Sequence, residues 1–214
     1  MKLKSIIAIA LMAVGLSANA QTLSRSMESA IAACQGVSQA LEHSSTAPLK
    51  AANKVLKAAD IVNFGDLSLK KGKDLDVKGH LIFDEEFLDS LIVNRKVLAF
   101  SSRYAKKRSH RGSTGVEGRI RMTTKALKAG QSATWKTVNK GTAEFAVVAE
   151  PGGLLTMTIR NEKGKVLYAE TVRNKQGAPV RKAQIKLPEN QSTTLLIEVV
   201  NHATTDTSFA IMKN

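Results

Sequence analysis

The sequence has very little cysteine and few aromatic residues, and each shortage argues against a class of structure or function. Cys34 is the single cysteine, so no disulfide can form within one chain. Its place in a helical stripe, described below, favours a small buried apolar side chain over a reactive thiol. Aromatic residues make up 4% of the chain, with one tryptophan and two tyrosines. Surfaces that bind sugars or single-stranded nucleic acids stack their ligands on exposed rings, so this composition argues against both.

The signatures of common catalytic sites are also missing. The sequence contains no G-x-S-x-G elbow, no H-E-x-x-H pair, no Walker A loop and no Rossmann glycine fingerprint. His80 with Asp84 is the best acid–base or metal couple. The acids Asp84, Glu85, Glu86 and Asp89 could hold a glycosidase pair, although acids at a helix start more simply complement the helix dipole. We therefore expect no catalytic residue, no metal and no cofactor. A hydrolase whose site assembles only in three dimensions is the alternative.

Residues 1–20 have the three parts of a secretory signal peptide. Lys2 and Lys4 give a positive start, residues 6–16 are apolar, and Ala18-Asn19-Ala20 matches a cleavage site. The apolar run is shorter than the roughly 20 residues of a membrane span. We predict cleavage after Ala20, a secreted or periplasmic protein, and no transmembrane span in the mature chain. An uncleaved anchor is the alternative.

Residues 21–62 are expected to form a helical hairpin. Met27, Ala30, Cys34, Val37 and Leu41 follow a 3-4-3-4 spacing that places them on one side of a helix. A second helix is predicted for about residues 47–60, after a break at 43–46 that can supply its cap. The stripe could instead mark a partner-binding helix or a dimer seam.

Residues 63–114 are expected to be a mixed connecting segment. Asn63, Gly65 and Asp66 are typical of a turn, and the Lys-Lys-Gly-Lys run at 70–73 is typical of a solvated loop. Apolar residues at helical spacing indicate a short helix at 83–93, and a strand at 81–83 is the alternative.

Residues 115–214 have the pattern of short strands separated by turns. Leu155, Met157 and Ile159 alternate with polar residues, which gives a strand one apolar and one polar face. A spacing of about 8–12 residues between strands is typical of a sandwich or barrel. We therefore predict an antiparallel β-sandwich preceded by the helical hairpin, a mostly β fold with N-terminal helices. About eight strands fit, near 116–126, 131–138, 142–149, 154–160, 165–172, 180–187, 193–200 and 207–213.

Two local patterns refine this prediction. Val147-Val148 and residues 195–197 are apolar on both faces, which suits central strands that are covered on one side by another element, such as the N-terminal helices. Residues 161–164 are predicted to form a hairpin with a type I turn, in which Gly164 takes the left-handed bulge position.

The strand region also resembles a known family. Leu127-Lys128-Ala129-Gly130-Gln131 precedes a strand, glycine-flanked strands follow, and the closing strand carries Phe209 and Ile211. In these features residues 115–214 resemble the bacterial pre-peptidase C-terminal type of β-sandwich. The resemblance implies a non-catalytic appendage of a secreted protein.

The positive charge is concentrated in one part of the chain. The formal net charge is +14. Residues 95–128 hold eleven lysine and arginine residues against the single acid Glu117, whereas residues 21–94 hold eight against ten and residues 129–214 hold eleven against seven. Nearly all of the excess therefore belongs to residues 95–128.

The densest part of this charge, residues 103–111, continues into the small residues of 112–115. Such a run is most simply a solvated loop that like-charge repulsion keeps extended. It could instead be a patch for anions, namely lipid phosphate, acidic polysaccharide, nucleic acid or an acidic protein, because arginine suits phosphate and carboxylate. A protease-sensitive processing site is a third interpretation. The candidate binding residues are Arg103, Lys106, Lys107, Arg108, Arg111, Arg119 and Arg121.

The sequence thus predicts an exported, non-enzymatic binding or structural module of the cell envelope. An anion-binding protein that acts through residues 103–121 is the first alternative, and the hydrolase is the second. Nucleic acid is the least expected partner, because the protein carries an export signal and lacks the signatures of RNA-binding and helix-turn-helix domains.

Overall fold

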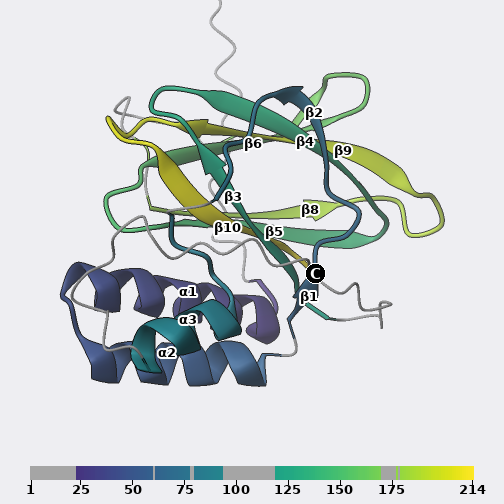
Figure 1. The fold of residues 1–214 in the computed structure, drawn as a ribbon. Coiled ribbons are helices and arrows are strands. Elements are labelled where there is room, and N and C mark those ends of the chain that lie inside the picture. Colours follow the sequence, from purple (N-terminus) through teal and green to yellow (C-terminus); the bar gives the residue numbers. More distant parts are fainter. Residues whose placement is uncertain (1–22, 60, 78–79, 94–118, 170–176, 178) are drawn as a thin grey trace, which may run out of the picture.

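The computed structural model describes residues 23–59, 61–77, 80–93, 119–169, 177 and 179–214. These residues form three layers, in which a group of helices lies under one face of a sandwich of two β-sheets (Figure 1). The predicted mostly β fold with N-terminal helices is confirmed. None of the described helices is both long enough and apolar enough to span a membrane.

The described residues contain three helices, α1 (Arg25–Glu42), α2 (Thr46–Ala58) and α3 (Glu85–Val93). The predicted stripe of α1 is buried from Met27 to Leu41, and Cys34 is fully buried within it. Eight strands lie close to their predicted positions, namely β3 (Arg121–Leu127), β4 (Ser132–Asn139), β5 (Thr142–Ala149), β6 (Leu155–Asn161), β7 (Val166–Ala169), β8 (Val180–Lys186), β9 (Thr193–Asn201) and β10 (Thr207–Lys213).

Two further strands, β1 (Val62–Asn63) and β2 (Ser68–Gly72), precede α3 in the sequence. β1 pairs in parallel with β3, and β2 pairs antiparallel with β4. The prediction of a solvated loop at 70–73 is therefore wrong for residues 70–72. Every residue of β2 is exposed, and lysines are common on exposed sheet edges because they discourage pairing with other chains. A charged edge strand has the composition of a loop, which explains the error.

In the part of the chain that the structure describes, each sheet has five strands. The first, which we call sheet A, has the order β1-β3-β10-β5-β8, and sheet B has the order β2-β4-β9-β6-β7. All described pairings apart from β1 with β3 are antiparallel. The predicted hairpin at 161–164 is confirmed, because the Gly164 N–H donates to the Asn161 carbonyl and Gly164 has a φ of 81°.

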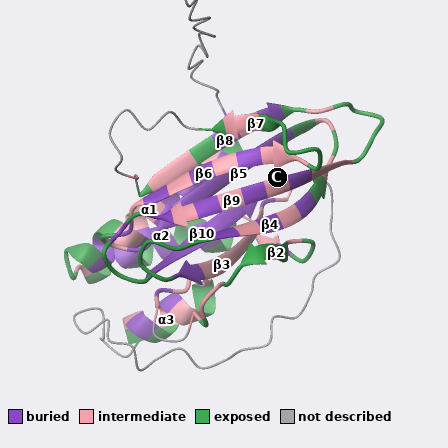
Figure 2. Cartoon of the chain, turned by 90° about the horizontal axis from the view of Figure 1, so that it is seen from above, coloured by how far each residue is buried: buried purple, intermediate pink, exposed green. Residues whose placement is uncertain are grey.

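The space between the sheets is filled by the residues that alternate inward along each strand. Trp135, Phe145 and Phe209 are fully buried there, and the Trp135 and Phe209 rings meet edge to face with their centroids 5.8 Å apart. On β9, buried residues alternate with partly exposed ones (Figure 2). This alternation is the pattern expected of a sheet with one dry and one wet face.

A second core lies between the helices and the outer face of sheet A. Val148, Ala210 and Met212 face the helices, whereas Val147 and Ile211 face the inside of the sandwich. The central strands β5 and β10 are thus covered on both faces, as predicted for 147–148. The same prediction is wrong for 195–197, because Leu196 is only partly buried and belongs to neither core.

Buried polar contacts attach the helical layer to the sandwich. The Glu144 carboxylate accepts hydrogen bonds from the Ser24 N–H and Oγ, at 2.6 and 2.5 Å, and Ser24 is the N-cap of α1. The Glu150 carboxylate accepts from the N–H groups of Leu81 and Ser208. These contacts fix α1 and the segment that leads into α3 on opposite ends of β5.

Candidate functional site

Five of the seven predicted binding residues, namely Arg103, Lys106, Lys107, Arg108 and Arg111, lie outside the described residues. Arg119 and Arg121 lie within them, where the chain enters β3. Ile120 between them is buried in the helical core. The anion patch therefore stays a prediction, and only its C-terminal end can be placed.

Arg121 belongs to an ion cluster at one end of the sandwich. Its Nη1 lies 3.3 Å from Oδ1 of Asp66, and the other oxygen of that carboxylate lies 2.7 Å from Nζ of Lys213. The Lys213 ammonium also donates to Thr137 Oγ1 and to the Val138 carbonyl. Arg121 thus shares the single negative charge of Asp66 with Lys213, and these three side chains together carry a net positive charge.

The cluster changes the acidity of both partners at its centre. Burial alone would raise the pKa of Asp66. The hydrogen bond and charge of Lys213, the Thr137 hydroxyl and the charge of Arg121 outweigh burial and hold this pKa below its usual 3.8. Burial lowers the pKa of Lys213, and the hydrogen bond and charge of Asp66 oppose that change. The arrangement is that of a structural ion pair that joins the last strand to the β1–β2 turn.

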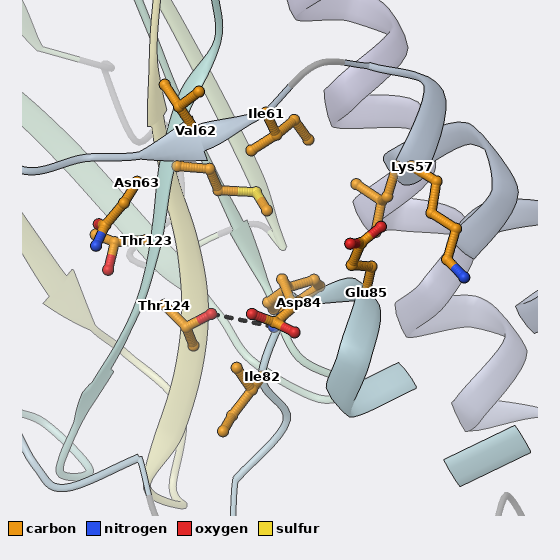
Figure 3. A pocket seen from close by; sticks show the side chains of 12 residues that line it. Lys57, Ile61, Val62, Asn63, Ile82, Asp84, Glu85, Thr123 and Thr124 are labelled. Carbon is orange, nitrogen blue, oxygen red and sulfur yellow. Dashed lines mark hydrogen bonds between the residues drawn. The ribbon is translucent and has the colours of Figure 1, made fainter. Parts of the chain in front are cut away.

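A groove of about 340 Å³ opens at the edge of sheet A, beside α3 (Figure 3). Four segments that are distant in sequence form it: the end of α2, strand β1, the residues that lead into α3, and strand β3. Its lining residues are Leu56, Lys57, Ile61, Val62, Asn63, Ile82, Phe83, Asp84, Glu85, Met122, Thr123 and Thr124.

The groove is lined by apolar and polar side chains in equal number. Leu56, Ile61, Val62 and Met122 supply aliphatic surface, whereas the other half of the lining is polar or charged, so the groove is more polar than a typical small-molecule site. Figure 3 shows the Glu85 carboxylate directed into the space between α3 and Ile61.

The acids at the start of α3 make different contacts. Asp84 Oδ1 accepts hydrogen bonds from the N–H groups of Glu86 and Phe87, so Asp84 caps the helix. Asp89 accepts from Asn53 and lies 2.6 Å from Nζ of Lys57. None of these contacts brings two carboxylates together around a shared water or proton, as a glycosidase pair requires.

The histidine and cysteine candidates for catalysis have structural neighbours. The proposed couple of His80 with Asp84 is wrong, because His80 Nδ1 lies 3.0 Å from Oε1 of Glu150 instead. Cys34 is fully buried, its Sγ lies 3.8 Å from Sδ of Met122, and burial raises the pKa of its thiol. Among the described residues, no group of three or more His, Cys, Asp or Glu side chains is placed to hold a metal ion.

Sequence reasoning did not find the groove. Its lining comes from four short segments that are distant in sequence, and one of them is β1, which was not predicted as a strand. The signal that was available is the acidic start of α3, which is the most acidic part of an otherwise basic chain.

No protein-family model and no curated protein match the chain. Solved structures do match it. The pre-peptidase C-terminal domain of a collagenase from Bacillus anthracis is 10% identical with a TM-score of 0.33, over 44% of this chain and 87% of that domain. TmCBM61, solved with β-1,4-galactotriose, is 11% identical with a TM-score of 0.26, over 47% of this chain and 85% of that one. A family 16 carbohydrate-binding module is 11% identical with a TM-score of 0.28, over 43% of this chain and 76% of that module.

The first of these structures is of the type that residues 115–214 resemble. A likeness at this level of identity concerns the sandwich fold and says nothing about a ligand.

Proposed function

We propose that the protein is an exported, non-enzymatic module of the cell envelope that binds an anionic component through residues 103–121. The ligand is a lipid phosphate or an acidic polysaccharide. The observation that carries this proposal is the distribution of charge, with eleven basic residues and one acid in residues 95–128 and near balance elsewhere. A local excess of this size attracts polyanions and raises their rate of association.

The elements that flank the cationic run support this assignment. The run follows α3, which is anchored by the buried residues Leu88 and Leu91, and it ends in β3, which pairs with β10 along its whole length. Within β3, Arg121 pairs with Asp66 and Lys125 pairs with Asp74. Residues 103–111 hold five of the eleven basic residues of this region and no acid, so we expect the unbalanced charge to be densest there.

The side chains that could have served a hydrolase support the non-enzymatic part of the proposal. Cys34 is buried, and His80 and Glu150 hold the segment before α3 against the sandwich. His202 Nε2 lies 2.9 Å from Oγ1 of Thr156, in the turn between β9 and β10. Each of these side chains is either buried or in contact with another residue of the protein, which gives it a structural role without a substrate.

Two binding assays test the proposal and separate the two ligands. The protein should be retained on heparin, as a model of an acidic polysaccharide, or should sediment with vesicles of anionic phospholipid. Retention should fall steeply with salt, because screening weakens contacts between exposed charges. Replacing Lys106, Lys107, Arg108 and Arg111 with Ser should abolish it.

The matched control removes the same charge from another surface, by replacing Lys50, Lys54, Lys140 and Lys186 with Ser. These four lysines are exposed on the described body. Equal losses in the two variants would show a nonspecific effect of net charge and would overturn the proposal. Export is tested separately by N-terminal sequencing of the secreted protein, which should begin at Gln21.

A further inference from the structure

The edge of sheet A is interrupted where it borders the groove. β1 pairs with β3 only at Arg121 and Met122, and the Met122 carbonyl accepts from the N–H of Phe64 at 3.2 Å. Two residues beyond Thr124, the Ala126 carbonyl accepts from the N–H of Leu75 at 2.8 Å. Strand β3 is therefore paired on either side of Thr124.

Thr124 itself has no backbone partner on this side among the described residues. Alternate residues of a strand direct their N–H and C=O groups to the same edge, so those of Thr124 point the same way as those of Met122 and Ala126. The Thr124 side chain is occupied, because its Oγ1 accepts from the N–H of Phe83 at 3.0 Å. One backbone donor and one backbone acceptor thus face the groove.

The walls beside this gap are negatively charged in a basic protein. Glu85 has no hydrogen-bond partner for its carboxylate among the described residues, and Asp84 uses only one oxygen to cap α3. Lys57, which also lines the groove, is bound to Asp89 and interacts electrostatically with Glu85, and Figure 3 shows its amine turned away from the groove. One lysine thus stands against the three acids Asp84, Glu85 and Asp89. A ligand with a positive charge is therefore complementary to the site.

We propose that this groove binds an extended basic peptide segment, one residue of which pairs with the backbone of Thr124. The peptide residue that pairs with Thr124 is a lysine or arginine. Its side chain lies along Ile61, Ile82 and Met122, and its cation lies at Glu85 and Asp84. Peptides commonly add to exposed strand edges in this manner, with backbone bonds for affinity and side-chain sites for specificity. Lysine and arginine bury their aliphatic stems readily while keeping the charge at a polar rim. This site is separate from residues 103–121 and does not depend on anion binding.

The test uses the full mature chain and three short peptides in an NMR titration. The probe is acetyl-Val-Lys-Val-amide. One control peptide has norleucine in place of lysine, which removes the cation and keeps the aliphatic stem. The other carries a methyl group on the lysine backbone nitrogen, which removes the donor to the Thr124 carbonyl. The norleucine peptide lacks a contact with a charged group and should bind about tenfold more weakly, and the N-methyl peptide lacks a neutral hydrogen bond worth about 1 kcal/mol and should bind about fivefold more weakly.

Protein variants give an independent comparison. The double variant Asp84→Asn with Glu85→Gln keeps the helix cap, because asparagine is also a good N-cap residue. It should weaken lysine-peptide binding by about tenfold or more, whereas Glu42→Gln with Glu189→Gln, which changes two exposed acids elsewhere, should not. Equal binding of the lysine and norleucine peptides, equal binding by the two variants, or no shift at the Thr124 amide would each overturn the proposal.

Discussion

Replacing Lys213 with methionine tests the structural role of the ion cluster. Lys213 is 2% exposed, and its Nζ donates to Asp66, Thr137 and Val138 at 2.7, 2.7 and 3.1 Å, with Asn139 Oδ1 at 3.2 Å. Methionine keeps most of the apolar stem but removes the ammonium, whose Nζ also lies 5.1 Å from the centroid of the Phe64 ring. The variant therefore removes the polar contacts and this cation–π contact together.

The expected loss of stability follows from those contacts. Breaking a buried ion pair on one side typically costs about 3–5 kcal/mol. Asp66 is 35% exposed and keeps its contacts with Arg121 and Thr137, which reduces the cost. The Val138 carbonyl loses a donor, at about 1 kcal/mol. We expect Lys213→Met to lower the free energy of unfolding by about 2–3 kcal/mol.

Urea denaturation followed by circular dichroism measures this difference, with the exposed Lys140→Met as the control. The pKa of Asp66 is lowered in the folded protein, so the stabilisation that it contributes is present above its unfolded value of 3.8 and is lost as the pH falls through the lower folded pKa. The difference between wild type and Lys213→Met should therefore shrink below about pH 4. A loss under about 0.5 kcal/mol at neutral pH, as for an ordinary surface substitution, would refute this account of the cluster.

Three further predictions concern other parts of the fold. Glu144→Gln should weaken the attachment of Ser24 by about 1–2 kcal/mol and speed hydrogen exchange in α1 more than in the sheets, and uniform exchange would contradict it. Gly153→Ala should destabilise by about 1–3 kcal/mol in thermal unfolding, because the new Cβ would lie 2.5 Å from Cγ2 of Thr207; an unchanged Tm would show that the turn relaxes. Cys34 should react with a thiol reagent only after denaturation, since burial raises its pKa, and rapid native labelling would disprove its burial.

The sandwich was predictable because its strands have strong period-two alternation and clear turns. Leu155, Met157 and Ile159 point inward as their spacing indicates. The continuous apolar run of β5 correctly indicated a cover on its second face. The inference from a continuous apolar run to a covered strand failed at Leu196. A single apolar residue on a solvent-exposed face of a sheet gives the same sequence pattern as one that another element covers.

The segment that supplies β1 and β2 was not predictable as strands. β1 has two residues, and β2 consists of exposed residues on a sheet edge, so neither shows the alternation that marks a half-buried strand. Their place is set by pairing with β3 and β4, which are far away in sequence. The groove is lined by β1 and by β3, with which β1 pairs, and it was missed for the same reason.

The candidate sites were also predictable only in part. Composition alone located the basic residues, because charge is visible without a fold. It did not indicate that Arg121 is paired with Asp66, or that His80 contacts Glu150 and not Asp84. Such contacts join residues that are distant in sequence, and only the tertiary structure specifies them.

The salt dependence of heparin affinity tests the central claim most directly. Each cation that contacts a polyanion releases counterions, so the logarithm of the binding constant falls with the logarithm of the salt concentration in proportion to the number of contacts. We predict a steep slope for the wild type that the serine variant of Lys106, Lys107, Arg108 and Arg111 largely loses. A slope that is the same in that variant and in the wild type would show that these residues are not the anion site.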